Sequence, residues 1–363
     1  KFNAKHSLRS GAYFNRYFYN LSNRNYNSET QEVEEKLKAE SDATTIQLFS
    51  QWNYRLSQAL TVNAGLHYLQ LTDNHSQSLE PRASVKYNVN EEQSLSFGYG
   101  LHSQIQPIGI YEAKLTDEAG NISQPNKNVG LNKSHHFVLA YDRALSKYMR
   151  VKAETYYQYL FNIAVKNDPA SPISTLVIEQ GYFTDPLVNK GTGRNYGVEL
   201  TLEQFTHNGL YFLLSTSLYD SKYKALDNIL RNTRFNGNYS LSLTGGKEFQ
   251  WKKNRTFGVN IKTIYSGGFR YTPIDIARSV ELGEAEYMES LAFSEQQSDY
   301  FRTDFRLSLK RNRTKSTSTI SLDIMNATNH QNEGGQYFDV QSATVKKWYQ
   351  MPLIPVISYR IEF

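Results

Sequence analysis

The chain has 363 residues, a formal net charge of +5 and no cysteine, which excludes disulfides, cysteine-ligated metal centres and cysteine nucleophiles. Only 39% of the residues are hydrophobic, and no run approaches the roughly 18 apolar residues that a membrane-spanning helix needs. Aromatic residues nevertheless reach 13%, which is not typical of a disordered chain. Basic residues are scattered and form no contiguous stripe, so no nucleic-acid partner is predicted.

Apolar and polar residues alternate along most of the chain, which is the pattern of β-strands with two different faces. The clearest case is 300–310, where Phe301, Phe305 and Leu307 alternate with charged or polar residues. We count about 14 such segments. They are expected to start near Ala4, Asp42, Leu60, Pro81, Gln93, Lys133, Met149, Arg194, Gly209, Asn236, Arg255, Ser298, Thr317 and Met351.

The connections alternate in length. Those after even-numbered segments are short, whereas those after odd-numbered segments run from about nine to about thirty residues, beyond ordinary loop lengths. The longest are expected near 104–132, 162–193 and 267–297. All long loops therefore emerge at one end, as in barrels with tight periplasmic turns and long extracellular loops. The predicted fold is an all-β, antiparallel, up-and-down transmembrane barrel, apolar towards outer-membrane lipid and polar inside.

Two loops show a helical pattern. In 29–40, Val33 and Leu37 are four residues apart, and in 284–293, Tyr287, Met288 and Leu291 fall on one side of a helix. We expect both segments to form short helices over the barrel mouth.

The C-terminus ends on a predicted strand. Tyr359, Ile361 and Phe363 share one face of it, and Phe363 is the last residue. A terminal aromatic residue on an amphipathic final strand resembles the signal that the outer-membrane barrel assembly machinery reads. We expect these three residues to act as an assembly signal.

Several stretches resemble the TonB-dependent receptors of Gram-negative outer membranes. They are 79–82 (LEPR), 95–104 (LSFGYGLHSQ), 128–141 (NVGLNKSHHFVLAY), 191–203 (GTGRNYGVELTLE), 300–309, 320–329 (ISLDIMNATN) and 355–363. The resemblance implies import of a large, scarce nutrient (a ferric siderophore, a cobalamin-like compound, a glycan or a peptide) by energy-coupled rearrangement of a plug. Such barrels have about 22 strands. Residues 1–363 would then be the C-terminal part of the barrel, without the plug that contacts the TonB complex.

Two groups of residues are predicted to serve transport. The first comprises aromatic and polar residues of the long loops, which would contact the substrate: Gln104, Gln106, Tyr111, Tyr182, Phe183, Arg270, Tyr271 and Tyr337. The second comprises charged residues on one face of the last strands, which would line the lumen: Arg302, Asp304, Arg306, Lys310 and Asp323.

No pattern in the sequence predicts catalysis or a cofactor. The eight histidines have no close metal-ligand spacing, and neither a G-x-S-x-G elbow nor a phosphate-binding loop is present. Three alternatives to a TonB-dependent importer remain open at this point: a passive 14-stranded channel, a non-transporting adhesion barrel, and an enzyme at the barrel rim.

Overall fold

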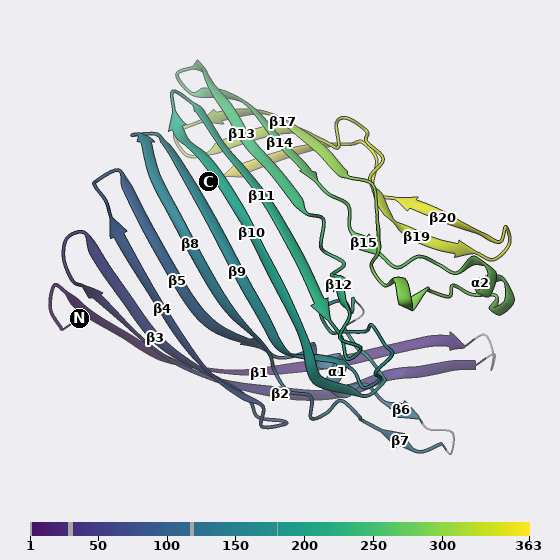
Figure 1. Cartoon of the computed structure of the whole chain (residues 1–363). Helices are drawn as coiled ribbons and strands as arrows, with labels where there is room; N and C mark the ends of the chain where they lie inside the picture. Colours follow the sequence, from purple (N-terminus) through teal and green to yellow (C-terminus); the bar gives the residue numbers. More distant parts are fainter. Residues whose placement is uncertain (1, 28–31, 117–119, 180) are drawn as a thin grey trace.

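The computed structural model describes residues 2–27, 32–116, 120–179 and 181–363. One antiparallel sheet dominates it, and its main strands follow one another in chain order (Figure 1). They are β1 (His6–Asn27), β2 (Glu32–Arg55), β3 (Leu60–Leu71), β4 (Gln77–Asn88), β5 (Gln93–Gln104), β8 (Asn132–Ser146), β9 (Met149–Lys166), β10 (Leu187–His207), β11 (Leu210–Lys224), β13 (Tyr239–Lys252), β14 (Arg255–Ser266), β17 (Tyr300–Asn312), β18 (Thr317–Met325) and β21 (Ile354–Glu362). The predicted all-β fold is confirmed. In the described residues the sheet is open, with β1 and β21 at its edges.

From β4 onwards short turns and long loops alternate as predicted, and both chain ends lie at the short-turn end (Figure 1). The turn between β10 and β11 shows why such turns can be short. Asn208 and Gly209 have φ angles of 50° and 76°. Both residue types tolerate the left-handed backbone that a two-residue hairpin with the correct twist requires.

The predicted helix at 29–40 is wrong. Residues 28–31 lie outside the described residues, and β2 already begins at Glu32, paired with Asn27 of β1. Leu37 and Ala39 lie two apart on one face and are 6% and 9% exposed. A spacing of four residues fits a strand as well as a helix, and pairing with β1 selected the strand. The second strand therefore starts ten residues before the predicted Asp42.

The helix predicted at 284–293 is reduced to the single 3₁₀ turn η1 (Glu289–Leu291). A true helix, α2 (Ile276–Leu282), precedes it. Asp275 caps its first turn by accepting a hydrogen bond from the Arg278 N–H at 3.0 Å, and Gly283 ends it in the left-handed conformation. These two caps are the local signals for α2.

One loop is shorter than predicted. Because β4 begins at Gln77, only residues 72–76 separate it from β3. Pro81, expected at the strand start, lies inside β4 opposite Leu66.

The remaining elements belong to the long loops: α1 (Ile108–Glu112), β6 (Leu115–Thr116), β7 (Ile122–Ser123), β12 (Leu230–Asn232), β15 (Arg270–Tyr271), β16 (Glu295–Gln296), β19 (Glu333–Asp339) and β20 (Thr344–Tyr349). The best-buried apolar residues also gather at this end. One cluster combines Ile110, Tyr111 and Val129 with Ala164 and Leu187. In the described residues, no helix is long and apolar enough to cross a membrane.

Strand register gives the sheet one apolar and one polar face. Leu307 pairs with Leu322, which pairs with Ile357, whereas the next residue, Ser308, pairs with Ser321. Leu307 is 38% and Ile357 is 77% exposed. An extended exposed apolar surface is unfavourable in water but suits contact with lipid. We call the two sides the apolar face and the polar face.

Exchanging neighbouring residues of β17 for arginine tests these faces. We expect Leu307→Arg to destabilise the membrane-embedded protein by about 2–4 kcal/mol, because the charge enters lipid near the middle of a strand. Ser308→Arg is the matched control, since Gly258 lies opposite and leaves space on the polar face. Unfolding by guanidinium in lipid vesicles measures both changes. Equal losses in the two variants would contradict the assignment of the faces.

Candidate ligand-binding site

The long loops form an open cavity of about 650 Å³. These loops lie at the end of the sheet opposite the chain termini (Figure 1). Residues from 172–183, 271–297 and the β19–β20 hairpin line it, together with Arg234. This volume falls within the range of about 300–1,000 Å³ that is typical of small-molecule sites. The lining includes six aromatic side chains: Tyr182, Phe183, Tyr271, Tyr287, Phe293 and Trp348.

Charge is sparse in the cavity. Among the described lining residues, only Glu179, Arg234 and Glu289 have acidic or basic side chains. Arg234 is paired with Glu179, and its guanidinium also lies 5.8 Å from the centre of the Phe269 ring. The lining is thus mainly apolar, and the one cation among its described residues is already paired.

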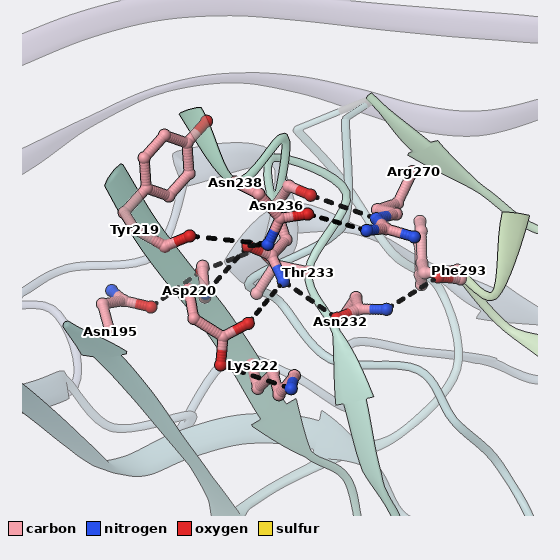
Figure 2. Close-up of polar contacts among 11 residues, drawn as sticks. Asn195, Tyr219, Asp220, Lys222, Asn232, Thr233, Asn236, Asn238, Arg270 and Phe293 are labelled. Carbon is pink, nitrogen blue, oxygen red and sulfur yellow. Dashed lines mark hydrogen bonds and ion pairs between the residues drawn. The ribbon is translucent and has the colours of Figure 1, made fainter. Parts of the chain in front are cut away.

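A buried polar network joins β11 to the loop 225–238 (Figure 2). Asn236, only 1% exposed, is its centre. The Asn236 amide nitrogen donates to Asp220 Oδ1 at 2.9 Å and to Asn232 Oδ1 at 2.8 Å. The amide oxygen accepts from the Ser221 N–H at 3.0 Å. Each of these bonds satisfies a polar group that would otherwise be costly to bury.

Arg270 extends this network to the loop 267–299 (Figure 2). Arg270 Nε donates to the backbone oxygen of Asn236 at 3.1 Å, and Nη2 donates to Asn238 Oδ1 at 2.8 Å. The Asn232 amide nitrogen lies 3.5 Å from the backbone oxygen of Phe293, which lines the cavity. The loop 267–299 is therefore attached to the loop 225–238, which Asn236 in turn attaches to β11.

The β19–β20 hairpin is attached at its base by two buried side chains. Asn332 brackets the Phe301 backbone, accepting from its N–H at 2.7 Å and donating to its oxygen at 2.9 Å. Glu333 accepts from the Ser298 hydroxyl at 3.2 Å and pairs with Lys347 at 2.9 Å. Burial alone would raise the pKa of Glu333, but the hydrogen bond from Lys347 and two further bonds lower it below its usual value.

The structure brings three of the predicted substrate contacts together in the cavity. Tyr182 and Phe183 come from one loop and Tyr271 from another, and all three line it. Tyr337 is 47% exposed on the neighbouring hairpin, and Gln104 is exposed at the end of β5. Neither of these two belongs to the cavity lining.

The other three predicted contacts are engaged within the protein. Gln106 is 1% exposed, and its amide nitrogen donates to Asn132 Oδ1 at 2.8 Å. The Tyr111 hydroxyl accepts from the Gln106 N–H at 3.0 Å, and burial raises the pKa of Tyr111. Arg270 is held by the network described above. Gln106, Tyr111 and Arg270 thus take part in loop packing, and their role in substrate contact stays a prediction.

The charged residues predicted for the lumen share the polar face. Arg302 Nε lies 2.7 Å from Asp304 Oδ1, and Arg306 Nε lies 3.6 Å from Asp323 Oδ1 on the next strand. Lys310 continues the same face towards the short-turn end. The face thus carries alternating, mutually compensating charge.

A second hollow, of about 620 Å³, lies on the polar face of the first strands. Its lining includes Arg9, His67, Arg82, His102 and His136. Glu80 Oε2 lies 2.9 Å from His67 Nδ1 and 2.8 Å from Arg82 Nη2. In the part of the chain that the structure describes, no group of three or more histidine or acidic side chains has the geometry of a metal site.

Comparison with known proteins identifies the family. The family model described as TonB dependent receptor-like, beta-barrel matches residues 1–329. The chain belongs to the TonB-dependent receptor family. A comparison with curated protein sequences gives no match.

Solved structures of TonB-dependent receptors share its fold. The ferric yersiniabactin uptake receptor FyuA from Yersinia pestis has 12% identity and a TM-score of 0.67, covering 99% of this chain and 52% of that one. The ferric-catecholate import receptor Fiu from Escherichia coli K12 has 12% identity and a TM-score of 0.64, covering 98% of this chain and 51% of that one. BauA, the ferric preacinetobactin receptor of Acinetobacter baumannii, has 11% identity and a TM-score of 0.62, covering 99% of this chain and 51% of that one. The chain spans about half the length of these structures, and at such identities the likeness shows the fold alone.

In this TonB-dependent receptor, sequence analysis missed the cavity residue Trp348 and the network residue Asn236. Trp348 lies on the second strand of a loop hairpin that was not predicted, and Asn236 was taken as a strand start. The available signals were local: the Gly334–Gly335 pair and the asparagines flanking Gly237. Each signal indicates a turn or an irregular backbone conformation at its own position. Neither signal indicates which residues elsewhere in the chain that position contacts.

Removing the Asn236 side chain tests the network. We expect Asn236→Ala to lower the local stability of the loop 225–238 by about 1–3 kcal/mol, because buried partners lose their hydrogen bonds. Hydrogen exchange of the loop amides measures the change. Asn254→Ala, at an exposed position in the short turn before β14, should leave that exchange unchanged. Unaltered protection in Asn236→Ala would refute the role of the network.

Acid should release the β19–β20 hairpin through Glu333. Because the folded-state pKa of Glu333 is below its ordinary value, its stabilising contribution is complete above that ordinary value of about 4.3. This contribution is lost as the pH falls through the lowered pKa. Trp348 fluorescence, in a variant with Trp52 and Trp251 replaced by phenylalanine, should report this transition. Introducing Glu333→Gln into that variant should remove the transition. If the fluorescence titration were the same with and without Glu333→Gln, another group would be responsible for the transition.

Proposed function

We propose that this chain is the C-terminal part of the barrel of an energy-coupled importer in the outer membrane of a Gram-negative bacterium. The observation that carries the proposal is the arrangement of its polarity: an apolar face for lipid, a polar face, and an aromatic cavity at the long-loop end. Membership of the TonB-dependent receptor family supports it. The long loops would face the outside of the cell and receive the nutrient.

The polar face would enclose the lumen and contact a plug. Arg302, Asp304, Arg306, Lys310 and Asp323 would bind the plug by hydrogen bonds or line the path of the substrate. The hollow beside Arg82 offers further donors on the same face. The fourteen strands described here would combine with roughly eight others in a barrel of about 22. The TonB complex would act on the plug, without any bond being made or broken in the substrate.

Uptake by the intact receptor tests this function. Deleting the whole gene should abolish growth on a nutrient that the wild type takes up, and a protonophore should have the same effect on wild-type cells. Restoring the gene without the loop 167–186 should leave protein in the membrane but reduce uptake.

The results also separate the proposal from its alternatives. Uptake that survives the protonophore would identify a passive channel. Normal uptake after gene deletion, with altered attachment to surfaces, would identify an adhesion barrel. Ester hydrolysis by the purified protein would identify a rim enzyme.

The proposed assembly signal has its own test. Tyr359 is 65% and Ile361 is 44% exposed on the apolar face of β21, and the fully exposed Phe363 directly follows the strand. We expect deletion of Phe363 to reduce the amount of folded receptor in the outer membrane, because the assembly machinery loses its terminal aromatic contact. Heat-dependent mobility in gels measures the folded fraction. Glu362→Ala is the matched control. Undiminished assembly after deletion of Phe363 would contradict its role as an assembly signal.

A further inference from the structure

The β19–β20 hairpin presents Trp348 to the cavity on a support made of two glycines. The pairing of the strands shifts between Glu333 and Gly335, so Gly334 is an extra residue in a β-bulge. Trp348 is the partner of Gly335. A Cβ atom on Gly335 would lie 2.7 Å from the indole Nε1, and one on Gly334 would overlap the six-membered ring. The indole therefore lies over both glycines, which no residue with a side chain would allow.

The indole remains accessible to a ligand. Trp348 is 51% exposed and lines the cavity together with both glycines. Tyr271 and Tyr287, from another loop, line the same cavity. The face of an aromatic ring carries partial negative charge and attracts the partially positive C–H groups of a ring stacked on it. A supported, half-exposed indole is thus a stacking surface.

The base of the hairpin fixes this surface in place. Gly334 and Gly335 directly follow Asn332 and Glu333, which attach the hairpin to the start of β17. The Lys347 side chain, next to Trp348, pairs with Glu333 and does not belong to the cavity lining. Because its support is held before any ligand arrives, the indole loses little freedom on binding.

We propose that the cavity binds a neutral carbohydrate, with a pyranose ring stacked on Trp348. A pyranose combines a face of C–H groups with hydroxyls at its edge. Thr272, Gln297 and Gln336 line the cavity and supply hydroxyl and amide groups for such hydroxyls. The Thr272 hydroxyl already accepts from the Phe293 N–H at 3.2 Å and can still donate, and the Gln336 amide nitrogen donates to Glu333 Oε1 at 3.3 Å, which leaves the amide oxygen as an acceptor. This inference rests on the proposed import function and identifies the class of nutrient.

The charges of the lining favour a neutral ligand over an anionic iron chelate. A ferric tris-catecholate carries several negative charges and needs cations to replace its hydration. Arg234 is the one lining cation among the described residues, and it is already paired with Glu179. Glu289 adds a carboxylate to the lining, which would repel an anion. A carbohydrate needs no such compensation.

Binding to the purified full-length receptor in detergent tests the inference. A microarray of neutral oligosaccharides identifies the tightest probe, and calorimetry then measures its affinity for each variant. We expect Trp348→Ala to weaken binding by about tenfold or more, the loss of one stacked ring. Trp348→Phe should restore part of the affinity. Gly335→Val should also weaken binding, because its side chain displaces the indole. Trp251→Ala, near the short-turn end of β13, should bind as the wild type does.

The outcomes distinguish this inference from the proposed function. No binding to any neutral oligosaccharide, or equal affinity of the wild type and Trp348→Ala, would overturn the carbohydrate assignment. Energy-dependent uptake of a ferric tris-catecholate that Trp348→Ala leaves unchanged would also overturn it, while import itself stands. Trp348-dependent carbohydrate binding without energy-dependent uptake would support the inference and reject the import function.

Discussion

The pairing of backbone hydrogen-bonding groups is the constraint on which this structure depends. Inside a bilayer no water can satisfy an N–H or C=O group, so each strand that crosses must be paired on both sides. Consecutive antiparallel pairing meets this need for the twelve strands that lie between β1 and β21. In the described residues, β1 and β21 each have one unpaired edge. In the proposed barrel these two edges are the places where further strands pair.

Pairing fixes register, and register assigns every side chain to a face. A shift of the register by one residue would move Ser308 and Ser321 to the apolar face and Leu307 and Leu322 to the polar face. Such a shift is costly along a whole strand, so the alternation of residues specifies the sheet strongly. For this reason the sequence predicted the number and order of the main strands, the short turns, and the shared face of Arg302, Asp304 and Arg306.

The long loops obey a different rule, which explains why their details were not predictable. Their structure depends on contacts between residues far apart in the chain, such as Asn236 with Asp220 and Arg270, or Asn332 with Phe301. Local patterns are ambiguous there. The spacing of Val33 and Leu37 fits a helix as well as a strand, and only pairing with β1 decides between them. The cavity has no local signature, because its aromatic residues approach one another only in the folded chain.

Buried amides at the loop bases and exposed aromatics around the cavity therefore have complementary roles. Outside the membrane, water competes for every hydrogen bond, so a loop keeps one conformation only where its polar contacts are shielded. Asn236 is 1% and Asn332 is 3% exposed, whereas Trp348 is 51% exposed. The shielded amides hold the loops, whereas the Trp348 side chain remains half-exposed at the cavity. Glycine at 334 and 335 completes this division, because it lets a large ring rest on fixed backbone while its other face stays available for binding.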